Sequence, residues 1–271
     1  MTQPSACTFT PLLHRKSMAT KTFQHTPSAS PPGATPELLE KLQQESQRLE
    51  TAQPDEIIAW AVENYFPKLT MATAFGPEGC VILYFLSKIQ PRTHVFNLDT
   101  GYQFQETLDL RDRIAEKYGI EVELKRPETT VAEYEALNGG PVYKTDPERC
   151  CFERKVKVLR QAAVGYDAWM SGIRRDQSPD RAKAPIVGWD KKFNLVKISP
   201  LANWTKKEVW SLIVKENIPY NPLHDQGFPS IGCWPCTRAV HDGEDERAGR
   251  WSGMAKTECG LHSLEQDGSG I

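Results

Sequence analysis

Apolar residues recur at helical spacing in the first ordered part of the chain. Two helices are predicted there, over Glu37–Leu49 and Asp55–Phe66. The second helix places Ile57, Ile58 and Val62 on one side, at the spacing that brings side chains to a common face. Both helices are therefore expected to pack one face against a core.

Short apolar runs then alternate with helical patterns. Strands are predicted at Leu69–Ala74, His94–Leu98, Ile120–Lys125, Asp167–Ser171 and Leu195–Ile198, and helices at Cys80–Ile89, Phe104–Tyr118 and from about Glu148. Thr205 and Glu208 form a capping box that predicts another helix through Lys215. This order predicts an α/β fold, a doubly wound, mostly parallel sheet covered by helices on both faces.

The two ends of the chain differ in composition from its centre. Residues 1–36 are rich in Ser, Thr and Pro and contain no acidic residue, so a disordered N-terminal extension is predicted. This tract faintly resembles a transit peptide, but a start site upstream of Met18 is the simpler explanation. Residues 37–240 are expected to form the α/β domain. Residues 241–271 lose apolar periodicity and are predicted to form a mobile C-terminal arm.

The composition of the chain disfavours two classes of function, nucleic-acid binding and membrane insertion. With 271 residues, of which 39% are hydrophobic, the chain can bury one sizeable core. The net charge of −2, without a basic stripe, disfavours nucleic-acid binding. The longest apolar run, Cys80–Leu86, is too short to span a bilayer, so no membrane partner is expected.

Four of the seven cysteines form two groups, Cys150-Cys151 and Cys233-Trp-Pro-Cys236. An odd number of cysteines without a secretory segment disfavours a disulfide framework and favours the cytoplasm. Adjacent cysteines suit one tetrahedral ion poorly because their side chains diverge, whereas the separate iron corners of a cubane can each take one thiolate. A 4Fe-4S cluster is therefore favoured over structural zinc, and unrelated thiols are the third interpretation.

Three cysteines remain outside these groups. Cys7 lies in the N-terminal extension, and Cys80 lies in an apolar run where a small buried side chain is expected. Cys259 lies in a Gly-containing segment, with Lys256 and His262 close in sequence. Such surroundings lower a thiol pKa and suit a nucleophile, although an idle exposed thiol is the alternative.

Loops that follow the predicted strands can bind an anion. They are Ala74–Gly79, Asp99–Gly101 and Ser171–Asp176, and the last carries Arg174 and Arg175. Ligands of parallel sheets bind beyond the carboxyl ends of the strands, and guanidinium groups match tetrahedral oxyanions. Ordinary turns and surface ion pairs with nearby acids are the alternatives.

Further cations are expected near the cysteines. On a helix from Glu148, Arg154 and Lys155 each follow one cysteine of the first pair by four residues, so both side chains should project near the thiolates. There they would moderate the negative charge of a cluster and attract an anionic substrate. Arg247 and Arg250 form a second basic pair in the arm, where a solvated charge run is the alternative.

Seven motifs between about residues 50 and 263 together resemble the assimilatory adenylyl-sulfate reductases of the APS/PAPS reductase family. They are Ala74–Gly79, Leu98–Tyr102, Cys150-Cys-X-X-X-Lys155, Gly172–Ser178, Asn221–Asp225, Gly232–Arg238 and Glu258–His262. The resemblance implies an adenine nucleotide alpha hydrolase-like fold. It also implies that the cysteines Cys150, Cys151, Cys233 and Cys236 hold a 4Fe-4S cluster that shapes the site without net redox change.

The resemblance further implies the reaction. Cys259 would attack the sulfur of adenosine 5'-phosphosulfate (APS), displace AMP and become an S-sulfocysteine, from which thioredoxin or a similar dithiol would release sulfite. The substrate-binding residues that it implies are Phe75, Gly76, Glu78, Gly79, Leu98, Lys155, Gly172, Arg174, Arg247, Arg250 and His262. A homo-oligomer is compatible with the sequence.

The sequence departs from the family's pattern at two places, and three alternative functions remain open. Ala74-Phe75 stands where some members have Ser-Gly, and the Ser-Gly-Gly-X-Asp-Ser signature of ATP pyrophosphatases is missing, which argues against ATP cleavage. Reduction of the 3'-phosphorylated substrate (PAPS), alone or besides APS, is the nearest alternative, although members restricted to PAPS generally lack the cluster cysteines. A tRNA sulfur-transfer or adenylating enzyme would need an ATP signature and a basic surface. A redox sensor would not need Cys259.

Overall fold

The computed structural model describes residues 33–254, 256, 258, 260 and 261. The predicted disordered extension therefore lies almost wholly outside the described residues, as do Cys259 and His262. Within the described part of the chain, no helix is long and apolar enough to cross a membrane.

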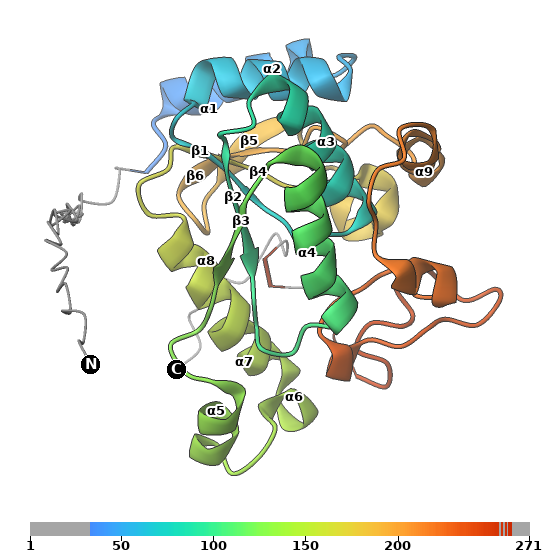
Figure 1. Cartoon of the computed structure of the whole chain (residues 1–271). Coiled ribbons are helices and arrows are strands. Elements are labelled where there is room, and N and C mark those ends of the chain that lie inside the picture. The colour runs from blue at the N-terminus through green and yellow to red at the C-terminus, as the bar shows by residue number, and fades with distance from the viewer. Residues whose placement is uncertain (1–32, 255, 257, 259, 262–271) are drawn as a thin grey trace, which may run out of the picture. The chain divides into compact units, whose positions relative to one another are not determined.

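Six strands in the described residues form one sheet in the order β3-β2-β1-β4-β6-β5 (Figure 1). They are β1 (Leu69–Ala72), β2 (His94–Leu98), β3 (Val122–Lys125), β4 (Ala168–Met170), β5 (Val187–Asp190) and β6 (Leu195–Ile198). The first four strands and β6 pair in parallel, and β5 pairs antiparallel with β6 at the edge. The predicted mostly parallel sheet is confirmed, and β5 is an additional strand that the pattern did not indicate.

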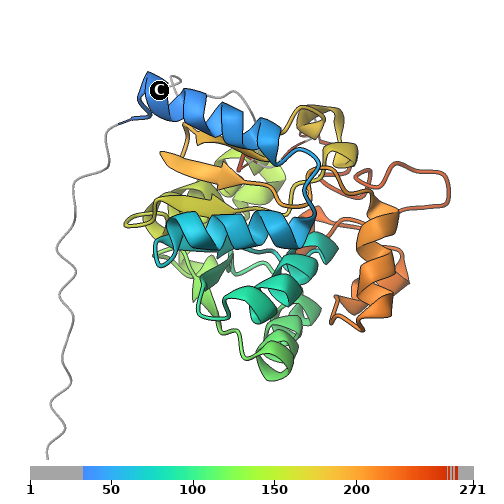
Figure 2. The same ribbon diagram turned by 90° about the horizontal axis from the view of Figure 1, so that it is seen from above.

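Helices cover both faces of this sheet. The α-helices of the described residues are α1 (Pro36–Arg48), α2 (Pro54–Tyr65), α3 (Pro77–Ile89), α4 (Gln105–Tyr118), α5 (Val131–Leu137), α6 (Val142–Thr145), α7 (Pro147–Cys151), α8 (Lys157–Ala162) and α9 (Lys206–Lys215). Figure 1 shows α8 on the opposite side of the sheet from α3 and α4, and Figure 2 shows α1 and α2 from above. The capping box of Thr205 and Glu208 opens α9 as predicted. The short helices α5 and α6 were not predicted.

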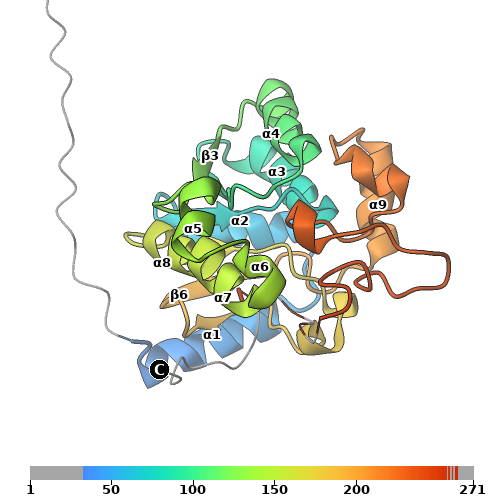
Figure 3. The ribbon, with the colours of Figure 1, turned by 90° about the horizontal axis from the view of Figure 1, so that it is seen from below.

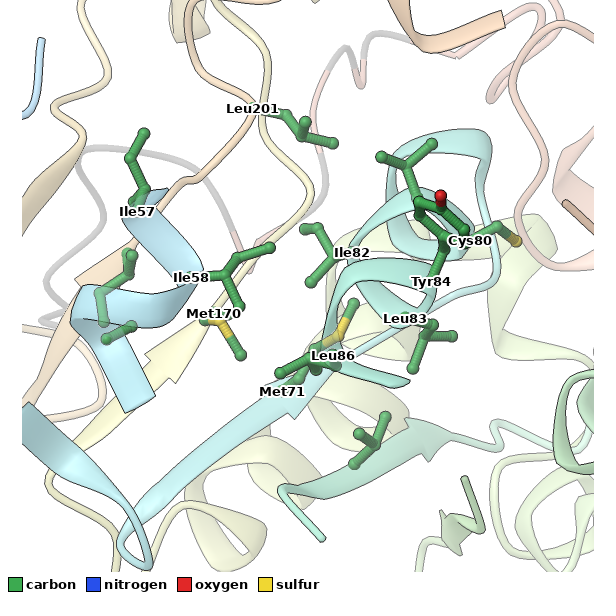
Figure 4. Close-up of a cluster of buried hydrophobic side chains, with 14 of the residues drawn as sticks. Ile57, Ile58, Met71, Cys80, Ile82, Leu83, Tyr84, Leu86, Met170 and Leu201 are labelled. Atoms are coloured by element: carbon green, nitrogen blue, oxygen red, sulfur yellow. The ribbon is translucent and has the colours of Figure 1, made fainter. Parts of the chain in front are cut away.

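The strands supply both faces with apolar side chains by simple alternation. In β4, Met170 joins the larger core cluster, whereas Trp169 joins a second cluster beneath α8. In β2, Val95 joins the larger cluster and Phe96 joins the second one. Figure 4 shows the larger cluster, where side chains of α2 and α3 meet Met71 of β1. Burial on both faces explains why the central strand β4 is entirely apolar, whereas the edge strand β3 alternates apolar and charged residues.

The turn after β1 is shorter than predicted. The strand ends at Ala72, and α3 begins at Pro77 instead of Cys80. Proline has a fixed φ and no N–H group, which suit the first turn of a helix. Phe75 adopts a left-handed backbone with φ 56°, and its amide donates to Thr73 Oγ1 at 3.0 Å, so the chain reverses within a few residues.

The strand order creates a switch point between β1 and β4. From β1 the chain builds outward through β2 and β3, and it then returns to β4 on the other side of β1. Loops that leave these two strands diverge and leave a crevice at the carboxyl edge of the sheet. Figure 3, which looks onto the molecule from below, shows α5, α6 and α7 grouped on one side and α9 on the other.

Candidate active site

A cavity of about 250 Å³ lies at this switch point. The loops after β1, β2 and β4 line it, together with residues from the C-terminal segment. Nine of the predicted substrate-binding residues contribute to its lining: Gly76, Glu78, Gly79, Leu98, Lys155, Gly172, Arg174, Arg247 and Arg250. The sequence therefore located the loops that converge here, although they are spread over some 170 positions of the chain.

Two glycines allow the loops to approach each other closely. A Cβ atom at Gly172 would lie 3.0 Å from the Cβ of Glu78, and one at Gly79 would lie 2.6 Å from Thr73 Oγ1. A side chain at position 172 would therefore crowd the first turn of α3, which would have to move by a few tenths of an ångström. Phe75 is not among the residues that line the cavity, because it is 1% exposed and packs in the main core.

The two arginines after β4 have different roles. Arg174 lines the cavity with 3% of its side chain exposed, and its Nε donates to Glu78 Oε1 at 2.7 Å. Its Nη1 pairs with Asp176, so the ion pair that was the alternative to anion binding is also present. Arg175 instead pairs with Glu50, two residues after the end of α1. Arg174 consequently fixes the first turn of α3, and its charge is compensated by two carboxylates.

Positive charge dominates the cavity. Its lining contains six Lys or Arg residues and three Glu residues, a formal surplus of three positive charges in a chain whose net charge is −2. Ser171 is 2% exposed and lines the same cavity, and its Oγ is buried without a hydrogen-bond partner. A small ligand with several negative charges and hydroxyl groups would satisfy both features.

All four predicted metal-ligating cysteines line a second, adjacent cavity. Cys150 and Cys151 come from α7, and Cys233 and Cys236 come from the loop before the C-terminal segment. Burial, reinforced by the other three thiols, raises the pKa of Cys150 to about 12. Thiols that line a common cavity become thiolates when metal cations bind them. In the described part of the chain, no group of three or more His, Cys, Asp or Glu side chains is placed to hold a metal ion.

The two cavities share a wall. Thr100, Lys155, Cys233 and Arg250 line both of them. Thr100 Oγ1 lies 3.3 Å from Cys233 Sγ. A ligand in the larger cavity and a group held by the cysteines would therefore contact the same side chains.

The helix that carries the first cysteine pair is irregular. Residues Phe152–Val156 form a π-helical segment between α7 and α8. This widened turn still brings Arg154 and Lys155 to the cysteine cavity, as the helical spacing predicted. Insertions of this kind are frequent at functional sites because they redirect side chains without ending the helix.

Arg154 is buried beside the cysteines, with 3% of the residue exposed. Its Nε donates to Thr100 O at 2.6 Å, its Nη2 donates to Thr129 O at 3.2 Å, and the guanidinium lies 5.0 Å from the Tyr134 ring centre. Its Nη1 has no hydrogen-bond partner, and neither has the buried Nε of Arg250. Buried cationic donors without partners fit an anionic group between the cysteines.

Several lining residues were not assigned a role from the sequence. They are Arg181, Lys206, Trp210, His224, Glu246 and Glu258. His224 lies in the Asn221–Asp225 motif and Glu258 opens the Glu258–His262 motif, and both motifs were usable signals. Desolvation by burial lowers its pKa, so its imidazole is neutral near pH 7. Arg181 has no local signal, because only the tertiary fold brings it to the cavity.

Residues 68–239 match the family described as Phosphoadenosine phosphosulfate reductase domain. The match covers more than half of the 271 residues. This chain belongs to that family. Similar proteins include the phosphoadenosine 5'-phosphosulfate reductase of Gloeobacter violaceus, 48% identical over 78% of this chain and 88% of its own length. The adenosine 5'-phosphosulfate reductase of Bacillus pumilus is 47% identical over 76% of this chain and 89% of its own length.

Solved structures place the reductase family within a broader fold. The phosphoadenylyl-sulfate reductase of Candida auris, in a phosphate complex, matches with a TM-score of 0.66 and 29% identity, over 77% of this chain and 99% of its own. The FMN adenylyltransferase of Candida glabrata, with FAD and pyrophosphate, matches with a TM-score of 0.50 and 17% identity over 75% and 70% of the two chains. The first likeness supports the predicted fold class, and the second concerns the fold alone.

Proposed function

We propose that the protein reduces adenosine 5'-phosphosulfate to sulfite and AMP in assimilatory sulfate reduction. The observation that carries the proposal is the wall shared by a cationic cavity at the switch point and a cavity lined by four cysteines. Relatives such as the Bacillus pumilus enzyme are adenosine 5'-phosphosulfate reductases. Family membership, cavity charge and cysteine placement thus support the same reaction.

In the first half-reaction the thiolate of Cys259 attacks the sulfur of the substrate. A bond forms between Cys259 Sγ and the sulfonate sulfur while the bond from sulfur to the phosphate oxygen breaks, and AMP leaves with that electron pair. Negative charge grows on the departing phosphate, where Lys155, Arg247 and Arg250 can stabilise it. We assign His262 and the predicted cavity residues Gly76, Glu78, Gly79, Leu98 and Gly172 to substrate binding.

In the second half-reaction a reduced dithiol such as thioredoxin attacks Cys259 Sγ. Sulfite leaves with the electron pair of the sulfur–sulfur bond, and a mixed disulfide forms between the enzyme and the dithiol protein. The second thiol of the dithiol then displaces Cys259 as a thiolate. The two electrons therefore come from the dithiol, and Cys259 is regenerated. A dithiol donor of this kind suits a reducing cytoplasm, which we propose as the compartment.

We propose that Cys150, Cys151, Cys233 and Cys236 hold a 4Fe-4S cluster. The residues present fit such a group, because four thiols line one cavity and two buried arginine nitrogens beside it lack partners. When bound, the cluster would supply a fixed anionic centre beside the substrate cavity. Lys155, which lines both cavities, would then interact with the cluster and the substrate together.

Substrate choice tests the proposal directly. We expect kcat/KM for APS to exceed that for PAPS by at least about tenfold, in parallel assays with the same reduced dithiol. Activity with PAPS alone would overturn the choice of substrate. Comparable values for both nucleotides would indicate a dual-specificity enzyme.

Lys155→Ala is expected to lower kcat/KM about 100-fold without loss of iron. The substitution removes a positive charge that faces the developing negative charge, and one such interaction contributes roughly 3 kcal/mol to transition-state stabilisation. Steady-state kinetics and iron analysis on the same preparation measure the two quantities. Lys157→Ala, on the same helix but outside both cavities, is the matched control and should retain both. Full activity of Lys155→Ala would refute the assignment.

A further inference from the structure

Glu258, the residue that precedes Cys259, is held inside the cavity by two arginines. Arg181 donates from Nε to Glu258 Oε2 and from Nη2 to Oε1, both at 3.0 Å. Arg247 donates from Nη2 to Glu258 Oε1, also at 3.0 Å. The side chains of Glu258 and Arg181 are only 7% and 10% exposed. A two-pronged, nearly buried ion pair of this kind is geometrically specific and weakly screened by salt.

The pair is part of a network that reaches the substrate loops. Gln177 Oε1 accepts hydrogen bonds from Arg181 Nη1 at 2.6 Å and from the Arg174 amide at 3.0 Å. Arg174 in turn holds Glu78 in the first turn of α3. The members of this network all line the cavity: Glu78, Arg174, Gln177, Arg181 and Glu258. The position of Glu258 is therefore set relative to the loops after β1 and β4.

The residues beyond Cys259 are also tethered to the fold. Lys192 Nζ donates to the carbonyl oxygen of Gly260. Leu261 packs against the apolar cluster that contains Leu98 and Trp169. The tethered residues Glu258 and Gly260 are the immediate sequence neighbours of Cys259.

We propose that Glu258 and Arg181 are positioning residues that fix the nucleophile at the cavity. The ion pair anchors the arm immediately before Cys259, and the Lys192 and Leu261 contacts anchor it immediately afterwards. The inference rests on the proposed function, since it presumes that Cys259 attacks a ligand in this cavity. Arg181 acts through Glu258 and need not contact the substrate.

Glu258→Gln and Arg181→Gln test the ion pair of Glu258 with Arg181, which we call the clamp. Each variant should slow formation of the Cys259 adduct at saturating APS, without reductant, by about 30- to 100-fold, because a displacement of about 1 Å at a reacting centre costs that much. The Kd for AMP should change by less than about threefold. Hydrogen exchange in a peptide covering residues 252–261 should become at least about tenfold faster. Arg181→Lys should form the adduct faster than Arg181→Gln, because lysine keeps the positive charge but cannot donate the two parallel hydrogen bonds of the guanidinium group.

The double variant and a matched control separate positioning from general damage. Arg181→Gln with Glu258→Gln should lose no more than about twofold beyond either single change, because the two residues act as a unit. Glu244→Gln breaks a similar two-pronged ion pair with Arg238, and neither residue lines the cavity. This control should leave the rate of adduct formation and the hydrogen exchange of the arm unchanged.

The outcomes distinguish this inference from the proposed function. If the unmodified protein forms no adduct on Cys259, the proposed function fails, while hydrogen exchange still reports on the clamp. If the adduct forms at the same rate in all variants, or if exchange in the arm is unchanged, the clamp is refuted. Faster adduct formation in Glu258→Gln would show that the carboxylate competes with the substrate, which also overturns the inference.

Discussion

Cys259→Ser is expected to lower turnover by at least about a thousandfold while the iron content stays at the level of the unmodified protein. A serine hydroxyl is a far weaker nucleophile than a thiolate at neutral pH, and removal of a nucleophile is among the largest single-residue effects in enzymes. Steady-state kinetics with a dithiol reductant, together with iron and sulfide analysis of the same sample, measure both quantities.

Cys80→Ala is the matched control for this experiment. Cys80 is fully buried in α3, outside both cavities, and burial raises its thiol pKa to about 12, so it carries no reactive thiolate. Figure 4 shows it among apolar side chains of the core. The control should lose some stability and keep its specific activity. Turnover by Cys259→Ser within tenfold of the unmodified protein would contradict the assigned nucleophile.

Cys233→Ala is expected to produce the second large effect, a loss of both iron and activity. Cys233 lines both cavities, and its Sγ lies 3.3 Å from Thr100 Oγ1, so the substitution removes one of the four proposed cluster ligands at the shared wall. We expect the iron content to fall by more than about half and turnover by at least about 100-fold, as is usual when a direct metal ligand is lost. Iron and sulfide analysis, the visible absorption spectrum and kinetics test this.

The same control applies to the metal content. Cys80→Ala removes a cysteine without touching the cysteine cavity, and it should retain full iron and sulfide. A Cys233→Ala protein with a complete iron complement and normal turnover would show that Cys233 is not a ligand. Zinc without iron in the unmodified protein would favour the structural-zinc interpretation instead.

The core of the fold could be predicted from the sequence because its signals are local. The strands β2 and β6 have the predicted bounds, since an apolar run bounded by turns identifies a strand buried on both faces. The edge strand β5 was missed because Val187-Gly-Trp-Asp190 mixes glycine and a charge with two apolar residues. An edge strand has only one neighbour, so its pattern is weaker than that of a central strand.

Parts of the candidate site depend on contacts that no local pattern records. The motifs indicated the cavity loops and the cysteine groups, and the structure brings both to one edge of the sheet. The inward turn of the Phe75 ring follows from its left-handed backbone, which propensity would not assign to phenylalanine. The pairing of Arg181 with Glu258 joins positions 77 residues apart and becomes visible only in three dimensions.

We propose that Cys259 takes the sulfonate group from adenosine 5'-phosphosulfate. The most direct measurement is mass spectrometry of anaerobically purified protein after incubation with this substrate in the absence of a reductant, with AMP quantified in the same mixture. We predict a sulfonate adduct confined to the peptide that contains Cys259, formed together with an equivalent amount of AMP. An adduct on another cysteine, or release of sulfite and AMP without any adduct, would contradict the account.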